Sequence, residues 1–442
     1  MTLEEKGRRD GRFFAFMIPA FFLWLIGQYT FPLFPTDQLN VIIPYFAQNH
    51  GWTPTDVTDP ASIGRFVLIP LTIVLGNIII KMGAKRAFCI FIFLFGASEI
   101  LIALDGSLSM VSIAMFLFPI LGVGMTMATF SLIRNWFRDW RGTALGIVTL
   151  VSPLSNATSI AYLTAGTSPG GIGFTPTFLI LALIVCAAGV VGMAIIRETP
   201  ESVGCFPDGA RTAPPPEELA DASLVGRIKM QHVFRHKESW FHLVVFGILL
   251  SSLTVYPAFF VTRFEQLGFT TAQMTAFTFG FSILGGILSL ISGIIDDRLG
   301  TKNASILLCS LFFLGTIGLR FGAPDRAWMI WIGIVALGGV IGAAPNLNPS
   351  MLLHTFGRKS FDHAFKWTYT VLNIFPAAGL YVTSFVLTKT GSLNPMYTAM
   401  IPVGALALIL LILIRNKVDL TADVLADQAG KEAGSAQPPT EP

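Results

Sequence analysis

Lys366, Thr370 and Asn373 are the polar residues whose spacing most clearly permits chemistry. They are four and three positions apart within an apolar run, so on a helix they lie on one face. A lysine ammonium can bind an anion, and the neighbouring hydroxyl and amide can make further hydrogen bonds. A polar stripe on an apolar helix faces a cavity or a partner, unless the lysine simply reaches the membrane interface. The stripe predicts a binding site for a small anion.

Other ionisable residues inside apolar runs are few, and each is a functional candidate because charge is costly there. Glu99 is a candidate for proton coupling, the alternative being a protonated or paired side chain. Arg65 and Arg320 are candidates for attracting an anion or for reaching the interface. Uncharged polar residues supply further candidate substrate contacts, each with the alternative of an ordinary hydrogen bond between helices: Gln28, Tyr29, Asn156, Ser252, Tyr256, Asn346 and Asn348.

A second kind of feature is a charged loop between two apolar runs. SGIIDDRLGTK, residues 292–302, holds two acids and two bases around a glycine, and GNIIIKMGAKR, residues 76–86, is related to it. Gly76, Lys81 and Gly83 of the first loop correspond to residues 217 positions later in the second loop, which are Gly293, Arg298 and Gly300. Such a pair predicts a duplicated unit with parallel topology.

The elements that position these residues are predicted to be membrane-spanning helices. The 442 residues are 53% hydrophobic and 12% charged, whereas soluble proteins have about 25% charged residues. Apolar runs of about 20 residues, long enough for a bilayer core of about 30 Å, recur along the chain. They lack the alternation of a membrane barrel, so we expect helices. We predict twelve spans, at 13–35, 60–80, 86–104, 108–133, 142–165, 174–196, 240–262, 272–295, 303–321, 327–352, 362–388 and 395–414.

The basic residues predict the orientation of these spans. An even number of spans puts both termini on one side. All but five of the 29 Lys and Arg residues fall on that side, the exceptions being Arg65, Arg263, Arg320, Arg326 and Lys389. The excess of basic residues in cytoplasmic segments predicts that both termini are cytoplasmic in a multi-pass protein of the cell membrane. The first apolar run shows no cleavage site and is too long for a signal peptide.

The longest polar interruption divides the chain into two sets of six spans. We predict a six-helix bundle at 1–198, a cytoplasmic linker at 199–239, a second six-helix bundle at 240–415 and a disordered cytoplasmic tail at 416–442. Within the linker, TAPPPEELADAS is expected to be flexible. SLVGRIKMQHVFRHKES is expected to form a basic amphipathic helix on the membrane surface.

The charged loops resemble the glycine–acid–base loop of the major facilitator superfamily. Gly293, Asp297, Arg298, Gly300 and Lys302 fit its pattern, whereas Ile80 stands where the first loop would have its acid. The resemblance implies an all-α membrane fold of twelve helices in two pseudo-symmetric bundles. It also implies a central substrate site, transport by rocking of the bundles, and a functional monomer. In this superfamily helices one, four, seven and ten line the cavity.

The resemblance further implies a role for the loop acid at the start of the fifth span. Asp297 would then form a cytoplasmic gate with Arg138 or Arg141, closed when the carrier opens outward, and Arg298 belongs to the same loop. A carboxylate beside a helix N-terminus gains about 0.3–1 kcal/mol, or up to about 2 kcal/mol when partly buried. The alternative is that these charges only fix the topology and anchor the loop.

Two further stretches resemble a narrower group, the oxalate/formate antiporters and related monocarboxylate carriers. They are LIRNWFRDWRGTALGI at 132–147 and RETPESVGCFPDG at 197–209. The chain departs from the oxalate carriers, which hold a dianion with cations on helices eight and eleven. Residues 272–295 contain no Lys or Arg, and Thr370 stands near the position of their helix-eleven lysine. A monocarboxylate or a larger, more apolar acid is therefore favoured.

Together these features predict a secondary active transporter of a small organic anion, by proton symport or anion exchange. The alternative is an exporter of amphipathic compounds with the same fold. A membrane enzyme is less well supported, because the six histidines form no convergent cluster with acids. A non-transporting sensor with the same fold is a further, less favoured alternative. We expect no enzyme activity, no cofactor and no metal. The expected partners are the substrate and the lipid bilayer. The net charge of +3 follows from membrane topology and gives no reason to expect nucleic acid.

Overall fold

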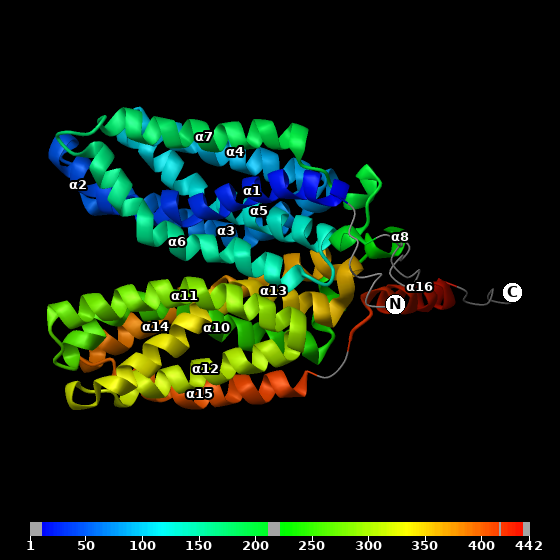
Figure 1. Ribbon diagram of the computed structural model, residues 1–442. Coiled ribbons are helices and arrows are strands. Elements are labelled where there is room, and N and C mark those ends of the chain that lie inside the picture. Colours follow the sequence, from blue (N-terminus) through cyan, green and yellow to red (C-terminus); the bar gives the residue numbers. More distant parts are fainter. Residues whose placement is uncertain (1–10, 211–221, 415–416, 436–442) are drawn as a thin grey trace, which may run out of the picture.

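The computed structural model describes residues 11–210, 222–414 and 417–435. Its long helices form two bundles that lie side by side, one above the other in Figure 1. Helix α1 begins at one end of the molecule, where the last helix, α16 (Leu420–Ser435), also lies. We call this the terminal end and the other the open end. The predicted flexible segment TAPPPEELADAS falls almost entirely outside the described residues.

The first bundle contains the helices that precede the linker. They are α1 (Gly11–Pro32), α2 (Leu39–His50), α3 (Pro54–Met82), α4 (Ala84–Ala103), α5 (Leu108–Trp136), α6 (Arg141–Thr167) and α7 (Phe174–Ile195). The long helices alternate in direction, and the most extensive packing joins α4 to α5 and α7, and α3 to α5.

The second bundle repeats this arrangement after the linker. Its members are α10 (Lys237–Gln266), α11 (Thr271–Leu299), α12 (Thr301–Phe321), α13 (Ala327–Leu372), α14 (Ile374–Thr390) and α15 (Asn394–Leu413). The fourth helix, α13, runs on through the short polar segment that the sequence suggested as a loop, with a sharp bend at Gly357, where φ is 72°. The predicted span 362–388 is broken at Asn373, and Pro376 lacks the N–H that would bond the Leu372 carbonyl.

The first predicted span also continues beyond its expected end. A five-residue π-helix, η2 (Leu33–Asp37), follows α1, and the N–H of Gln38 donates to the Leu33 carbonyl at 3.0 Å. Pro35 has no N–H for a regular helical bond, which accounts for the wider turn. Much of the segment between the first two predicted spans, 13–35 and 60–80, is helix α2. As a result Asp37 and Gln38 lie inside the bundle.

Ten stretches within the described residues are long and apolar enough to cross a membrane. One of them, 324–390, contains both α13 and α14, and the 27-residue α6 is not among the ten. The protein is therefore a multi-pass membrane protein. Twelve spans and cytoplasmic termini stay predictions.

The linker and tail differ from expectation. The linker forms two short helices, α8 (Ala222–Val225) and α9 (Met230–Phe234), instead of one basic surface helix, and His232 and Val233 are buried. The predicted disordered tail contains α16, which packs against α8, α9 and α13. Tertiary contacts thus order segments whose own composition is too polar to predict order.

Each bundle has its own apolar core. The core of the first bundle also takes in residues from the terminal end of α13, among them Leu352, Phe356 and Phe361. The core of the second bundle is separate. The two bundles are therefore joined through α13 at the terminal end.

Candidate functional site

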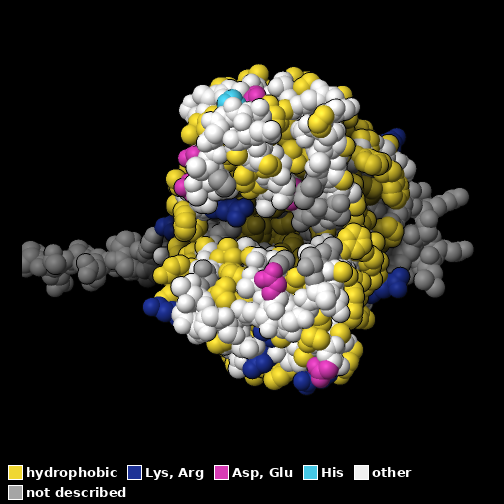
Figure 2. Space-filling view, turned by 90° about the vertical axis from the view of Figure 1, so that its left-hand side faces the viewer, with side chains coloured by type: hydrophobic (Ala, Val, Ile, Leu, Met, Phe, Trp, Pro, Cys, Tyr) yellow, Lys and Arg dark blue, Asp and Glu magenta, His cyan; other side chains and the backbone are white. Residues whose placement is uncertain are grey.

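At the open end the surface is hollowed between the two bundles, and the hollow is lined largely by hydrophobic side chains (Figure 2). At the terminal end the bundles meet. The candidate functional site accordingly has two parts, the hollow with its polar side chains and the contacts that close the terminal end.

The first closing contact joins α11 to the start of α6. The two Asp297 carboxylate oxygens accept hydrogen bonds from the backbone N–H groups of Gly142 and Thr143, both at 2.7 Å. The family resemblance implied that Asp297 lies at this helix start, where the structure has it. Its described partners, however, are backbone amides and not the guanidinium groups of Arg138 and Arg141. Amides at a helix N-terminus lack partners within the helix, so a carboxylate from another segment can satisfy them.

A second carboxylate supports this contact. Asp296 is buried and accepts a hydrogen bond from the Ser350 hydroxyl, to which Arg141 Nε also donates at 3.3 Å. Gly142 and Gly293 allow the helices to approach, because a Cβ on Gly293 would lie 2.2 Å from the Gly142 carbonyl oxygen. The α6–α11 contact therefore depends on side chains too small to separate the backbones. Arg298, also predicted for this gate, is exposed at the end of α11.

The other closing contact is built differently. Arg134 of α5 pairs with Asp362 of α13 at 2.7 Å, and Ser131 donates to the same carboxylate at 2.7 Å. In the first bundle Glu198 caps the start of α4, accepting from Ala84 N–H and Lys85 N–H at 2.8 Å each. The first charged loop has Ile80 where the second has its acid. On the side of the first loop, the bundles are closed instead by the ion pair between Arg134 and Asp362 of α13.

Asp208 holds the turn that leads into α6. Its carboxylate accepts from the backbone N–H groups of Arg138 and Asp139 at 2.9 and 2.7 Å. Burial raises the pKa of the Asp208 carboxyl, and these two donors oppose the rise.

Lys366 lies on the seam between the bundles. It is 5% exposed, its Nζ donates to Asn77 Oδ1 of α3 at 2.8 Å, and Nζ lies 4.8 Å from the Trp367 ring centre. Gly76 makes room for it, since a Cβ there would lie 2.6 Å from Lys366 Cγ. Two other residues of the predicted polar stripe, Thr370 and Asn373, make hydrogen bonds within their own helix. Their side chains donate to the carbonyls of Lys366 and Tyr369, respectively.

The other predicted polar residues fall into two groups. Tyr29 is hydrogen-bonded to the exposed Thr158 at 2.7 Å, and Arg65 is exposed in α3. The remaining residues are buried and have partners in the helix packing, while the side chain of Asn156 lies outside the described set. Those partners are Thr126 for Gln28, Leu249 O for Ser252, Thr316 for Tyr256, Ser289 O and Ser292 for Asn346, and His242 for Asn348.

The first bundle contains a buried carboxyl cluster formed by Asp37 and Glu99, with Gln38 beside them. Glu99 was a candidate from the sequence, whereas Asp37 was not. Asp37 Oδ2 accepts from Ser159 at 3.0 Å and from Ser155 at 3.3 Å. The next residue, Gln38, donates to Glu99 Oε2 at 3.2 Å, and both side chains are fully buried. In the sequence, Asp37 follows directly after an apolar run. An acid at such a position is equally typical of a loop. In the described residues no three His, Cys, Asp or Glu side chains form a metal site.

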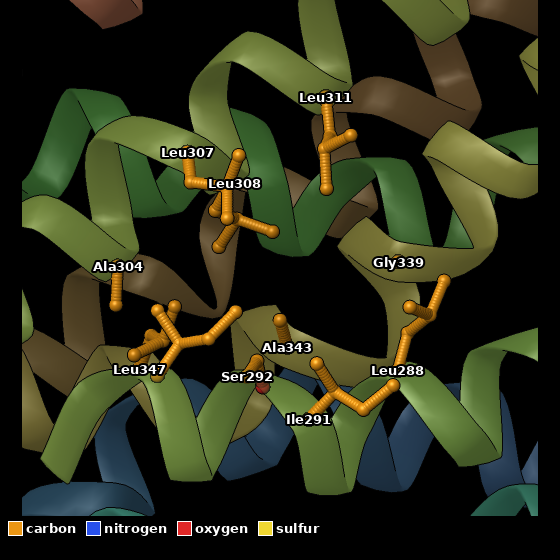
Figure 3. Close-up of a pocket in the computed structure, with 11 residues that line it drawn as sticks. Leu288, Ile291, Ser292, Ala304, Leu307, Leu308, Leu311, Gly339, Ala343 and Leu347 are labelled. Atoms are coloured by element: carbon orange, nitrogen blue, oxygen red, sulfur yellow. The ribbon is translucent and has the colours of Figure 1, made fainter. Parts of the chain in front are cut away.

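Two further pockets do not provide an alternative polar site. One, of about 70 Å³, lies between α11, α12 and α13 and is lined almost entirely by aliphatic side chains such as Leu288 and Leu308 (Figure 3). Another, of about 280 Å³, is an apolar groove between α1 and α6 on a face with the exposed side chains of Ile18 and Phe22. Neither is lined by a charged residue, so the seam and hollow remain the candidate site.

Two helical bundles that meet at one end and leave a hollow at the other are an arrangement suited to exposing one central site to each side in turn. The chain belongs to the Major Facilitator Superfamily, whose family model matches residues 13–379. None of the curated proteins matches it. The family and its structural neighbours are transporters and not enzymes.

Solved structures share the fold at low sequence identity. The transporter FucP in the outward conformation is 14% identical, with a TM-score of 0.64 over 91% of this chain and 98% of that one. The proton:xylose symporter XylE bound to 6-bromo-6-deoxy-D-glucose is 12% identical, with a TM-score of 0.67 over 93% and 99%. A variant of the E. coli fucose:proton symporter FucP is 13% identical, with a TM-score of 0.63 over 92% and 100%.

Proposed function

We propose that the protein moves a small organic anion, a carboxylate, across the cell membrane by alternating access. The observation that carries this proposal is the environment of Lys366. In the part of the chain that the structure describes, the partners of its ammonium are one amide oxygen and one ring, and no carboxylate pairs with it. A buried cation at the contact between two moving bundles is costly unless an anion comes to it.

Arg263 provides a useful contrast. It is also buried, but its guanidinium donates to the carbonyls of Leu319 and Arg320 and to Asn394. These partners belong to one bundle, so Arg263 is a structural cation with its donors occupied. Lys366 instead connects the two bundles, because it belongs to α13 and donates to Asn77 of α3. One buried cation suits a single carboxylate better than a dianion, and the hydrophobic lining of the hollow (Figure 2) suits an acid with an apolar part.

Arg65 and the carboxyl cluster complete the proposed cycle. Arg65 would attract the anion, since it is exposed and the only basic residue of α3 besides Lys81. Asp37 and Glu99 would bind the coupling proton, because burial inside the bundle favours the protonated form of a carboxyl. This makes proton symport the preferred mode over exchange. Two of the solved structures with this fold are proton symporters.

The test is a melting-temperature panel on detergent-purified protein, with formate, acetate, lactate, oxalate, aromatic acids and amphipathic cations. A ligand at 100 times its dissociation constant adds about 2.7 kcal/mol to the free energy of unfolding. We expect monocarboxylates to raise the melting temperature and oxalate to do so less. Stabilisation by amphipathic cations alone would contradict the proposal and favour export of amphipathic compounds.

Replacement of the carboxyl cluster is expected to uncouple transport from protons. Glu99→Gln and Asp37→Asn preserve shape but cannot release a proton. In proteoliposomes we expect both variants to lose the stimulation of acid uptake by an inward proton gradient, while ligand binding changes less than threefold. Glu265→Gln, at an exposed acid of α10, is the control and should keep the stimulation. Full stimulation in both cluster variants would rule out these carboxyls as the proton site.

A further inference from the structure

Helix α16 of the tail is attached to the linker by polar contacts. Asp427 accepts from Gln231 at 3.0 Å and lies 3.0 Å from His232 Nε2, and Asp423 lies 2.6 Å from His236 Nε2. His232 is 3% exposed, and its Nδ1 accepts the backbone N–H of Lys229 at 3.0 Å. The imidazole therefore has a fixed tautomer, with the Nε2 proton directed at Asp427.

Apolar contacts fix the same helix. Leu420 is fully buried and Val424 is 3% exposed, whereas Leu425 is 49% exposed. Just before α16, the N–H of Val418 donates to the Thr355 carbonyl of α13 at 2.7 Å. Val418, Leu420 and Val424 belong to the same apolar core as the end of α13 and the first bundle. Figure 1 shows α16 at the terminal end, beside α8.

The segment of α13 near this contact is the one that closes the terminal end. Arg358 donates to the Arg134 and Asn135 carbonyls, Asp362 pairs with Arg134, and Lys366 reaches Asn77. To open this end, α13 has to move away from α3 and α5. The tail and linker helices pack on α13, so that movement has to disturb their contacts as well.

We propose that α16 is an autoinhibitory brake, which stabilises closure of the terminal end by holding the linker helices against α13. Release of α16 then shifts the carrier toward the state that opens at the terminal end. This device depends on the two-bundle fold and not on the identity of the substrate.

The charges of the contact indicate that mild acid does not release it. The groups that face Asp427 are His232, Gln231 and, at 3.8 Å, Arg235; His236 faces Asp423. The hydrogen bond from His232 lowers the pKa of Asp427. A carboxyl whose pKa is lower in the folded protein stabilises the contact fully above its unfolded pKa of about 3.9. This stabilisation is lost only as the pH falls through the folded-state pKa. Asp427 is thus charged at neutral pH.

The test compares two neighbouring positions of one helix. Val424→Glu places a charge in the buried contact, and Leu425→Glu places the same charge on the exposed face. Spin labels at Arg86→Cys in α4 and Asn303→Cys in α12, both exposed, report the distance between the bundles at the terminal end in ligand-free protein in lipid nanodiscs. The four native cysteines are buried. We expect Val424→Glu to raise the long-distance population at least threefold and Leu425→Glu to leave it unchanged.

Two further measurements separate a brake from a loss of fold. The Asp423→Asn, Asp427→Asn double variant should give the same shift with an unchanged helical circular-dichroism signal. Adding a synthetic peptide of residues 417–435 in excess to a variant that lacks residues 417–442 should restore the short distance. If Val424→Glu and the truncated protein both keep the distance distribution of the unaltered chain, α16 is no brake.

Discussion

Asp297→Asn is expected to shift the ligand-free carrier by about tenfold toward the state open at the terminal end. The carboxylate accepts two short hydrogen bonds from backbone amides of the opposite bundle. Asparagine keeps one acceptor oxygen but loses the charge. Hydrogen bonds to charged groups contribute about 1.5–3 kcal/mol, and helix-dipole stabilisation of a partly buried carboxylate up to about 2 kcal/mol. A net loss of about 1.4 kcal/mol already corresponds to a factor of ten.

The same pair of spin labels, at Arg86→Cys and Asn303→Cys, measures this shift. The matched control is Asp325→Asn, at an exposed acid near the open end that pairs only with its neighbour Arg326 among its described ion pairs. It should leave the distances unchanged. A normal distance distribution in Asp297→Asn would mean that the α6–α11 contact is held by close packing alone, through Gly142, Gly293 and the bond between Thr149 and Ser289.

The position of Asp297 was predicted from the resemblance of its loop to the superfamily pattern. The glycines and charges at fixed spacing carry this resemblance, and the family fold implies which helix start lies opposite. The nature of its partner could not be predicted. Whether a carboxylate meets the Arg141 side chain or the amides after it depends on how closely α6 and α11 approach, and this distance follows from packing at Gly293 and Gly142.

For other polar residues the sequence did not determine which groups surround them. Asp37 follows two prolines and reads as part of a loop, yet the π-helix carries it into the bundle beside Ser155 and Ser159. Asn346 and Asn348 lie on a helix with polar groups on more than one side, so the sequence does not say which side meets a cavity. The structure directs them to α11 and α10. Whether a polar side chain is buried in a membrane bundle depends on which helices pack beside it, and the residue pattern of one helix does not determine this.

The tail shows the same limit at a larger scale. Its helix α16 has only a few apolar residues, of which Leu420 and Val424 are four positions apart, and such a short polar helix is marginal by itself. It is ordered by the linker and α13, which are distant in sequence. Composition alone therefore predicted disorder for a segment that has a docking site.

Lys366→Gln is expected to lower the affinity for the anionic substrate by at least thirtyfold. Removing one partner of a buried, hydrogen-bonded charge pair costs about 2–5 kcal/mol, and about 2 kcal/mol is already close to a factor of thirty. The unliganded protein should respond in the opposite direction. Because Lys366 is buried beside Asn77 and Trp367 with no described carboxylate partner, its removal relieves an uncompensated charge, and the melting temperature without ligand should stay equal or rise.

Melting temperatures with and without the stabilising acid therefore separate recognition from structure. Lys389→Gln, at an exposed lysine of α14, should keep the full ligand-induced rise. Gly76→Ala keeps the charge but places a methyl group where the Lys366 stem lies, so it should weaken binding with the ammonium still present. If Lys366→Gln lowers the ligand-free melting temperature and retains the ligand-induced rise, Lys366 is a gate contact to Asn77, and the anion is bound elsewhere in the hollow, with Arg65 as the next residue to replace.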